Sequence, residues 1–202
     1  MNVKIYVEGG GETRAIQAPL RRAFTNLLKN AGFAGRMPAI VGCGGRTEAF
    51  DVFLNAVSKP EPDTAYLLLV DSEDPVQTAP WEHLRTRVGD GWQRPESATD
   101  EQVHFMATCM ETWLIADIEN LKKFFGKGFN EKALLASNNT ENRARDKQKE
   151  VLENASKDCK TKFKKGDISF EILETTSPEK LLSLAYFQRF TDEIEKLKPR
   201  SR

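Results

Sequence analysis

Cysteine and histidine are scarce in this sequence of 202 residues. Its three cysteines, Cys43, Cys109 and Cys159, are odd in number and far apart, and only two histidines accompany them. Disulfide frameworks and structural zinc sites need paired or closely spaced ligands. Neither kind of site is therefore expected.

Long apolar runs and a net charge of one sign are also missing. No run approaches the roughly 18 apolar residues of a membrane-spanning helix, and the first residues turn polar too quickly for a signal peptide, so we expect a cytoplasmic protein that binds no membrane. The 30 acidic and 30 basic side chains balance. This balance argues against a protein that binds nucleic acid through a global basic excess, so nucleic-acid contacts should be local or assisted by a partner.

Short apolar runs alternate with helical spacing in the first part of the chain. Residues 3–7, 39–43 and 65–70 predict buried strands, whereas residues 13–30 and 47–57 place apolar side chains at helical intervals. Strands that alternate with helices favour right-handed crossovers. We therefore predict an α/β fold with a mostly parallel, Rossmann-like sheet flanked by helices.

The second half predicts a different organisation. Residues 75–100 are rich in Pro, Gly and Trp and predict a long loop, and residues 103–115 are ambiguous between a strand and a buried helix. Helices are expected at residues 117–125, 140–156 and 178–197. The predicted domain plan is a core at residues 1–120 and a mainly helical extension at residues 121–202, packed on the core as one unit.

Acidic residues fall where the predicted strands end. Glu8 ends the first strand, Asp71 and Glu73 follow the third, and Glu12 opens the next helix after a triple-glycine turn. Parallel sheets bind ligands at the carboxyl ends of their strands, and Mg²⁺ or Mn²⁺ takes oxygen ligands. A phosphate loop is the alternative, but the Lys-Ser/Thr of a Walker A motif is missing. We therefore predict a metal site formed by these four carboxylates.

Further candidates lie outside this set. Glu111 stands in an apolar run and is either a further metal ligand or half of a structural salt bridge. Arg46, after a glycine pair, suits a phosphate contact or a surface salt bridge. Lys164 and Lys165 belong to a basic cluster around Phe163 that either aids solubility or contacts the substrate.

Other polar and aromatic residues have simpler interpretations. Asp74 is expected to cap a turn, Asp51 to face solvent, and His104 to lie in the core or at its boundary. Both His83 and His104 are weak candidates for a general base. A separate prediction concerns the tryptophans of the 75–100 segment, Trp81 and Trp92, which we expect to be exposed and to bind a partner protein or nucleic-acid bases.

The spacing of the acidic residues resembles the TOPRIM pattern. The residues that carry the resemblance are Val7-Glu8-Gly9 and Leu69-Val70-Asp71-Ser72-Glu73, and TOPRIM proteins chelate Mg²⁺ with an early Glu and a later Asp-x-Asp. The interval from Glu8 to Glu12 further resembles the overcoming-lysogenization-defect nucleases. One departure is Glu73, which stands where TOPRIM enzymes usually have Asp.

A finer resemblance spans most of the chain. The triple-glycine segment, the Asp71 segment and Met110-Glu111-Thr112-Trp113 together look like a bacterial TOPRIM-like family often encoded beside an AAA or ABC-type ATPase. The resemblance implies a Mg²⁺-dependent nuclease of an anti-phage defence system, with Glu8, Asp71 and Glu73 as catalytic residues, DNA or RNA as substrate and an ATPase as partner. A homo-oligomer is left open.

Two other functions remain open from sequence. One is a non-catalytic regulatory subunit that uses a TOPRIM scaffold to hold the ATPase. The other is a CheY-like phosphoacceptor, because Asp71 also ends a strand near other acids. The missing acidic pair after the first strand argues against the phosphoacceptor.

Overall fold

The computed structural model describes residues 1–10, 14–134 and 140–198. Its centre is a sheet in which every pair of neighbouring strands is parallel, with the strand order β2-β1-β3-β4. The strands are β1 (Asn2–Val7), β2 (Ala39–Gly42), β3 (Thr64–Asp71) and β4 (Val103–Met106). The predicted α/β class, with a parallel sheet flanked by helices, is confirmed.

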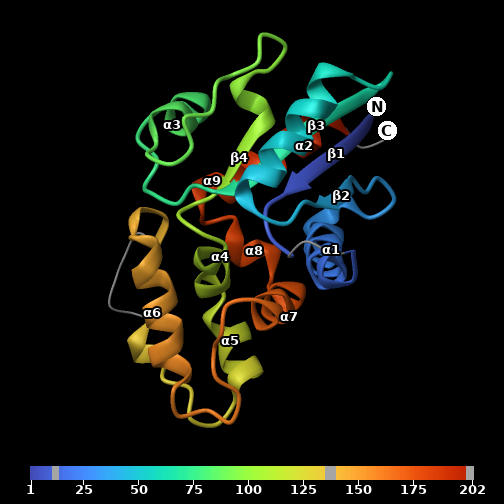
Figure 1. Cartoon of the computed structure of the whole chain (residues 1–202). Coiled ribbons are helices and arrows are strands. Elements are labelled where there is room, and N and C mark those ends of the chain that lie inside the picture. The colour runs from blue at the N-terminus through green and yellow to red at the C-terminus, as the bar shows by residue number, and fades with distance from the viewer. Residues whose placement is uncertain (11–13, 135–139, 199–202) are drawn as a thin grey trace.

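Helices cover both faces of the sheet and continue beyond its carboxyl edge (Figure 1). They are α1 (Arg14–Leu28), α2 (Arg46–Ser58), α3 (Pro80–Thr86), α4 (Glu111–Ala116), α5 (Ile118–Phe125), α6 (Arg145–Ser156), α7 (Asp167–Thr175), α8 (Pro178–Leu181) and α9 (Ala185–Leu197). Short 3-10 turns lie at Asp100–Gln102, Glu131–Ala133 and Thr140–Asn142, and a π-helical turn at Lys29–Phe33 extends α1. None of these described helices is long and apolar enough to cross a membrane.

Alternation along the strands divides the core into two layers. On β3, Leu67 and Leu69 face the cluster that contains α1, α4, α7 and α9, whereas Leu68 and Val70 face the cluster formed with α2 and α3. Successive side chains of a strand point to opposite faces. Because β3 is buried on both faces, its sequence is a continuous apolar run at residues 65–70 instead of an alternation of apolar and polar residues.

The C-terminal helices pack onto the sheet layer rather than standing apart from it. Helix α7 packs along α1, and α9 packs against β4. In Figure 1 the arrowhead of β1 points toward the group formed by α4 to α8. The carboxyl edge of the sheet thus faces the segment that the sequence assigns to an extension.

Several local predictions need correction. The 103–115 segment contains both alternatives, strand β4 and then helix α4, and the segment predicted as loop at residues 75–100 contains α3. The helix predicted at 178–197 is two helices, α8 and α9. Helix α7 was not predicted at all. Its sequence offers no N-cap side chain, and its preceding residue is Gly166 with φ +128°.

The expected exposure of the tryptophans is wrong. Trp81 is 4% exposed and Trp92 is 7% exposed, and both belong to the core beneath α2. The Trp92 ring stacks on Phe50 with a centroid separation of 4.1 Å, and Trp81 Nε1 donates a hydrogen bond to the carbonyl of Thr99. Burial of these apolar rings stabilises the fold, and the indole N–H of Trp81 keeps a hydrogen-bond partner inside the core. Neither ring is therefore available as an exposed anchor.

Candidate metal centre

Three carboxylates from two neighbouring strands meet at the carboxyl edge of the sheet. Glu8 directly follows β1, Asp71 is the last residue of β3, and Glu73 lies two residues beyond it. One oxygen from each lies within 4.8 Å of the others. Because β1 and β3 are adjacent and parallel, their ends bring these side chains together. We call Glu8, Asp71 and Glu73 the acidic cluster.

The acidic cluster is largely withdrawn from water. The side chains of Glu8, Asp71 and Glu73 are 15%, 6% and 9% exposed. Burial, and next the charge of Glu8, raises the pKa of Asp71 to about 8. Burial is also the main cause of a raised pKa at Glu8, although the Arg46 guanidinium opposes it. Burial thus disfavours the charged form of Glu8 and Asp71, and a divalent cation bound by their oxygen atoms would stabilise that charged form.

Backbone N–H groups hold the carboxylates of Glu8 and Asp71, and a backbone hydrogen bond fixes the main chain of Glu73. Glu8 Oε2 accepts a hydrogen bond of 3.1 Å from the Asp71 N–H, and Asp71 Oδ1 accepts one of 2.9 Å from the Met110 N–H. Glu73 adopts the left-handed conformation with φ +67°, and its N–H donates to the carbonyl of Thr108 at 2.8 Å. A non-glycine residue in this region is strained by about 1–3 kcal/mol and is typical of functional sites.

The glycine turn after β1 needs glycine at two positions. Gly9 and Gly10 have φ values of +116° and +81°. The N–H of Gly9 donates to the carbonyl of Gly44 at 2.6 Å, which joins the turn to the loop after β2. Glu12, predicted as a fourth ligand, lies outside the described residues.

Arg46 lies beside the acidic cluster, where it forms ion pairs with Glu8 and Asp90. At the start of α2, it donates to Glu8 Oε2 at 3.2 Å and to the backbone carbonyl of Asp71. Asp90 holds the same guanidinium through hydrogen bonds of 2.8 and 2.7 Å, and the ring of Trp92 lies 4.8 Å from its central carbon. The Arg46 side chain is thus fixed beside the carboxylates.

Two further arginines contact Glu73, and the sequence had assigned neither to the site. Arg145, the first residue of α6, pairs with Glu73 Oε2. Arg87 lies 3.7 Å from the same oxygen and 3.2 Å from both Asp74 and Asp90. Asp74, expected to cap a turn, instead pairs with Arg87.

Lys165 stands between Asp71 and Glu111. Its Nζ lies 3.5 Å from Asp71 Oδ2 and 3.7 Å from Glu111 Oε2. Glu111 is 1% exposed, and its Oε1 is buried with no hydrogen-bond partner among the described atoms. Glu111 therefore lies next to the acidic cluster with a lysine between, and both of its sequence interpretations remain open. Lys164 is exposed and lines a separate surface hollow.

Both histidines are buried and hydrogen-bonded. His83 Nε2 lies 2.9 Å from the carbonyl oxygen of Ser72, and its ring packs on Phe105. His104 is a core residue, as expected: its Nδ1 lies 3.2 Å from Arg189 Nη1. Burial, followed by the charge of Arg189, lowers the pKa of His104 to about 3. A neutral, enclosed imidazole of this kind is unsuited to accept a proton at neutral pH.

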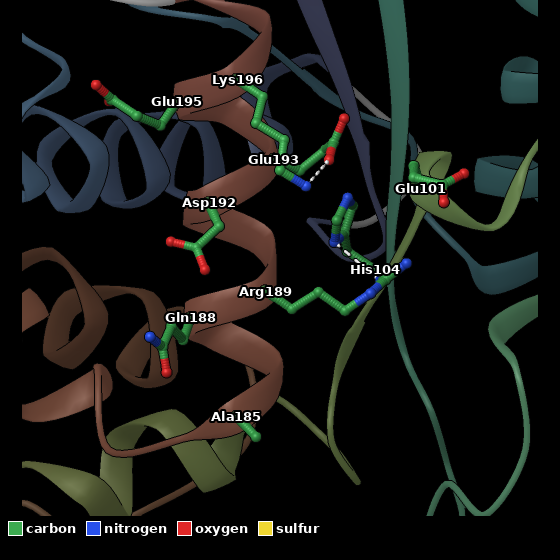
Figure 2. Close-up of a pocket in the computed structure, with 9 residues that line it drawn as sticks. All are labelled: Glu101, His104, Ala185, Gln188, Arg189, Asp192, Glu193, Glu195 and Lys196. Atoms are coloured by element: carbon green, nitrogen blue, oxygen red, sulfur yellow. Dashed lines mark hydrogen bonds and ion pairs between the residues drawn. The ribbon is translucent and has the colours of Figure 1, made fainter.

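A cavity of about 710 Å³ beside His104 is separate from the acidic cluster (Figure 2). Polar side chains of α9 and the β4 edge line it, and several already have partners: Glu193 pairs with Lys196 at 3.1 Å, and Glu195 with Arg36. Neither the acidic cluster nor its four cations reach this cavity. Its size alone does not make it the candidate site.

Sequence reasoning missed Asp90 and Arg145 because nothing local identifies them. Asp90 sits in a segment without periodicity, and Arg145 is one of many basic residues between 122 and 165. Glu73 and Arg145 are 72 residues apart in the chain. Only the packing of α6 near the end of β3 makes Arg145 a neighbour.

Comparison with known proteins identifies one family. The family model described as "Domain of unknown function (DUF4276)" matches residues 7–195. Neither a curated protein nor a solved structure matches the chain. The matched span includes the acidic cluster and the four cations around it.

Proposed function

The chain belongs to the DUF4276 family, whose description assigns no function, and we therefore propose a function from the site: hydrolysis of phosphodiester bonds in DNA or RNA by a nuclease that depends on Mg²⁺ or Mn²⁺. One observation carries the proposal. Three buried carboxylates converge at the carboxyl edge of a parallel sheet, and four cationic side chains surround them, namely Arg46, Arg87, Arg145 and Lys165.

The residues present fit a hard divalent cation. All three candidate ligands are carboxylates, and Asp71 has a pKa raised to about 8 because burial and Glu8 oppose its charge. A divalent cation would relieve this repulsion. When bound, such an ion orients a phosphodiester, activates water and stabilises the leaving oxygen.

The chain's own side chains supply the remaining functions. Glu8, Asp71 and Glu73 would hold the ion, and their hydrogen bonds keep them in place before it arrives. Arg46 and Arg145 are placed to bind phosphate oxygens, for which the planar guanidinium is well suited. Lys165, beside Asp71, would offset the negative charge that develops during hydrolysis.

We further propose that the family is related to TOPRIM proteins and that this member serves an ATPase-assisted anti-phage defence system. The order of the motifs supports the relation, since Glu8 and the Asp71-x-Glu73 pair end adjacent parallel strands. Glu73, in place of Asp, reaches the cluster from a left-handed backbone. The ATPase partner rests on the sequence resemblance and on the balanced net charge.

A non-catalytic scaffold is the second candidate. Ion pairs already engage each carboxylate of the acidic cluster: Arg46 contacts Glu8, Arg145 contacts Glu73 and Lys165 contacts Asp71. Such a network also suits a purely structural role. In that case the chain would bind its ATPase but neither a metal nor a nucleic acid.

Metal binding and cleavage together separate the two candidates. A Mn²⁺ titration monitored by electron paramagnetic resonance should show that the wild type binds the ion. Asp71→Asn should bind Mn²⁺ at least about ten-fold more weakly. Labelled DNA and RNA should be cut by the wild type with Mn²⁺ and not by Asp71→Asn. Asp51→Asn, an exposed carboxylate of α2, is the matched control and should behave as wild type. Absence of Mn²⁺ binding in the wild type would leave the scaffold as the better description.

A further inference from the structure

A second, mainly apolar cavity opens beside the acidic cluster. Its volume is about 190 Å³, and Glu8 and Asp71 are among the residues that line it. The other lining residues are Gly9, Gly10, Met106, Met110, Lys165, Gly166, Asp167 and Phe170. Because two proposed metal ligands belong to its wall, a molecule bound at the cluster can extend directly into this cavity.

The glycine turn after β1 forms one wall because side chains have no room there. A Cβ on Gly10 would lie 3.1 Å from the Cα of Gln17, and a Cβ on Gly9 would lie 3.2 Å from Leu20 Cδ1 and 3.6 Å from Phe170 Cζ. The positive φ values of both glycines also disfavour other residues. The ring of Phe170 therefore lies close to bare backbone.

Three apolar side chains from separate elements also line the cavity. Met106 ends β4, Met110 precedes α4, and Phe170 lies on α7. Thioether side chains adapt their shape and contact aromatic rings favourably, and a phenyl ring stacks on any flat base. This lining suits a planar aromatic group better than a charged or extended one.

Cations lie where the cavity meets the cluster. Lys165 lines the cavity, and its Nζ also lies 3.5 Å from Asp71 Oδ2. Arg145 pairs with Glu73, another member of the acidic cluster. A phosphate at the cluster would therefore meet positive charge while an attached flat group entered the apolar wall. A nucleotide combines these two groups in one unit.

We propose that this cavity receives the base of an unpaired nucleotide whose phosphate lies at the acidic cluster, so that single-stranded nucleic acid is the preferred substrate. The proposal rests on the proposed function for the role of the phosphate. An apolar cavity of about 150 Å³ holds one benzene ring, so 190 Å³ admits a single base and excludes a base pair. A base in a duplex must first leave its stack, which costs free energy that a single strand does not require.

Binding of a fluorescent oligothymidylate and of a blunt hairpin duplex tests this proposal, with Ca²⁺ replacing the catalytic metal. Loss of one base–aromatic stack lowers affinity by roughly 5- to 150-fold. The wild type should prefer the single strand, and Phe170→Leu should lose at least about five-fold of that affinity. Phe129→Leu, a partly buried phenylalanine near α5 that does not line the cavity, is the matched control and should bind as wild type.

A second variant keeps the test valid if Phe170→Leu fails to fold. Met110→Ala removes another apolar side chain of the cavity lining and should also weaken single-strand binding, and both variants should retain the wild-type circular dichroism spectrum. A single strand whose base is removed at one position should bind as weakly to the wild type as an intact strand binds to Phe170→Leu. Equal binding of single strand and duplex by the wild type would overturn the proposal, as would unchanged binding by both folded variants.

These outcomes are distinguishable from failure of the proposed function. Metal-dependent cleavage of single strand and duplex at equal rates, insensitive to Phe170→Leu, would leave the nuclease intact and refute the base-binding cavity. Single-strand binding that depends on Phe170, without Mn²⁺ binding or cleavage, would support the cavity and refute the nuclease.

Discussion

Asp71 is the residue at which burial and charge conflict most clearly. Its pKa is about 8 in the folded protein, against 3.8 for an unperturbed carboxyl, mainly because of burial and then because of Glu8, with Lys165 opposing both. Between these two values the folded state binds more protons than the unfolded state. The stability of the metal-free protein should therefore fall as the pH rises through this window.

Removing the charge of Asp71 should remove this pH dependence. Asp71→Asn keeps an oxygen that can accept from the Met110 N–H but carries no charge. Near pH 8 and without metal, the variant should be more stable than wild type by at least about 1.4 kcal/mol, the equivalent of one pKa unit, or about 3–6 °C in Tm. Thermal melts across the window, in a chelator, measure this difference. A variant that melts below wild type at high pH would show that Asp71 is structural.

Asp90 is a positioning residue for two of the cations. Its buried carboxylate hydrogen-bonds Arg46 and Arg87, which reach Glu8 and Glu73 respectively. Breaking a fully buried ion pair costs about 3–5 kcal/mol, and the partial exposure of both arginines reduces the expected cost of Asp90→Asn to about 2 kcal/mol.

The test of Asp90 needs a readout beyond stability. If Asp90 positions Arg46, then Asp90→Asn should raise KM for nucleic acid more than it lowers kcat, while Mn²⁺ affinity stays near that of wild type. Glu82→Gln, which removes an exposed pair with Arg85, provides the comparison. An unchanged KM in a destabilised Asp90→Asn protein would assign Asp90 to the fold alone.

At the scale of elements, α3 and the chain after it form part of the core instead of a docking loop. Trp92 stacks on Phe50 of α2 and lies beside Arg46. The segment therefore connects the second core layer to Arg46 beside the acidic cluster.

Trp92→Ala should consequently destabilise the protein. Truncation of a buried aromatic residue costs about 3–5 kcal/mol, and the loss should appear in urea unfolding of the isolated chain, with no partner present. Val88, in the same segment and 93% exposed, provides the control, since Val88→Ala should change stability by less than about 0.5 kcal/mol. If Trp92→Ala left the unfolding midpoint unchanged, the ring would have to be outside the core in solution.

Helix α7 has a similar linking role. It packs along α1 and carries Phe170 to the acidic cluster. A segment that the sequence places in an extension packed on the core thus lines the cavity beside the acidic cluster.

At the scale of the whole molecule, the balanced charge would limit the affinity of the proposed nuclease for nucleic acid. The chain has no net charge, and the cations near the cluster are Arg46, Arg87, Arg145 and Lys165. All four are already paired with carboxylates. We expect the isolated chain to be a weak nuclease at physiological salt and to gain activity with its partner.

Salt dependence measures this limit directly. If at most these four cations contact phosphates, a plot of log affinity against log salt concentration should have a slope no steeper than about −3 for a single strand. Arg145→Gln should remove one phosphate contact and so make the slope shallower by about 0.7. A much steeper slope for the isolated chain would mean that a larger basic surface binds nucleic acid, and a partner would then be unnecessary for affinity.

The sequence by itself determined three of the strands, β1, β2 and β3, and the carboxylates at the edge of the sheet. Alternation of apolar runs and helical spacing is a local property of the backbone, and it located β1, β2, β3, α1 and α2 within a few residues. Because parallel strands end at one edge, the positions of Glu8, Asp71 and Glu73 after their strands were enough to predict their convergence.

Only the tertiary structure decided what surrounds those carboxylates. Arg145 is 72 residues from Glu73, and Phe170 and Lys165 reach the site from the packing of α7 and the chain before it. Trp92 was assigned to the surface because a loop-like sequence does not reveal which ring it will meet, and here it meets Phe50. Contacts between residues far apart in the chain depend on how whole elements pack, and local sequence spacing carries no record of that packing.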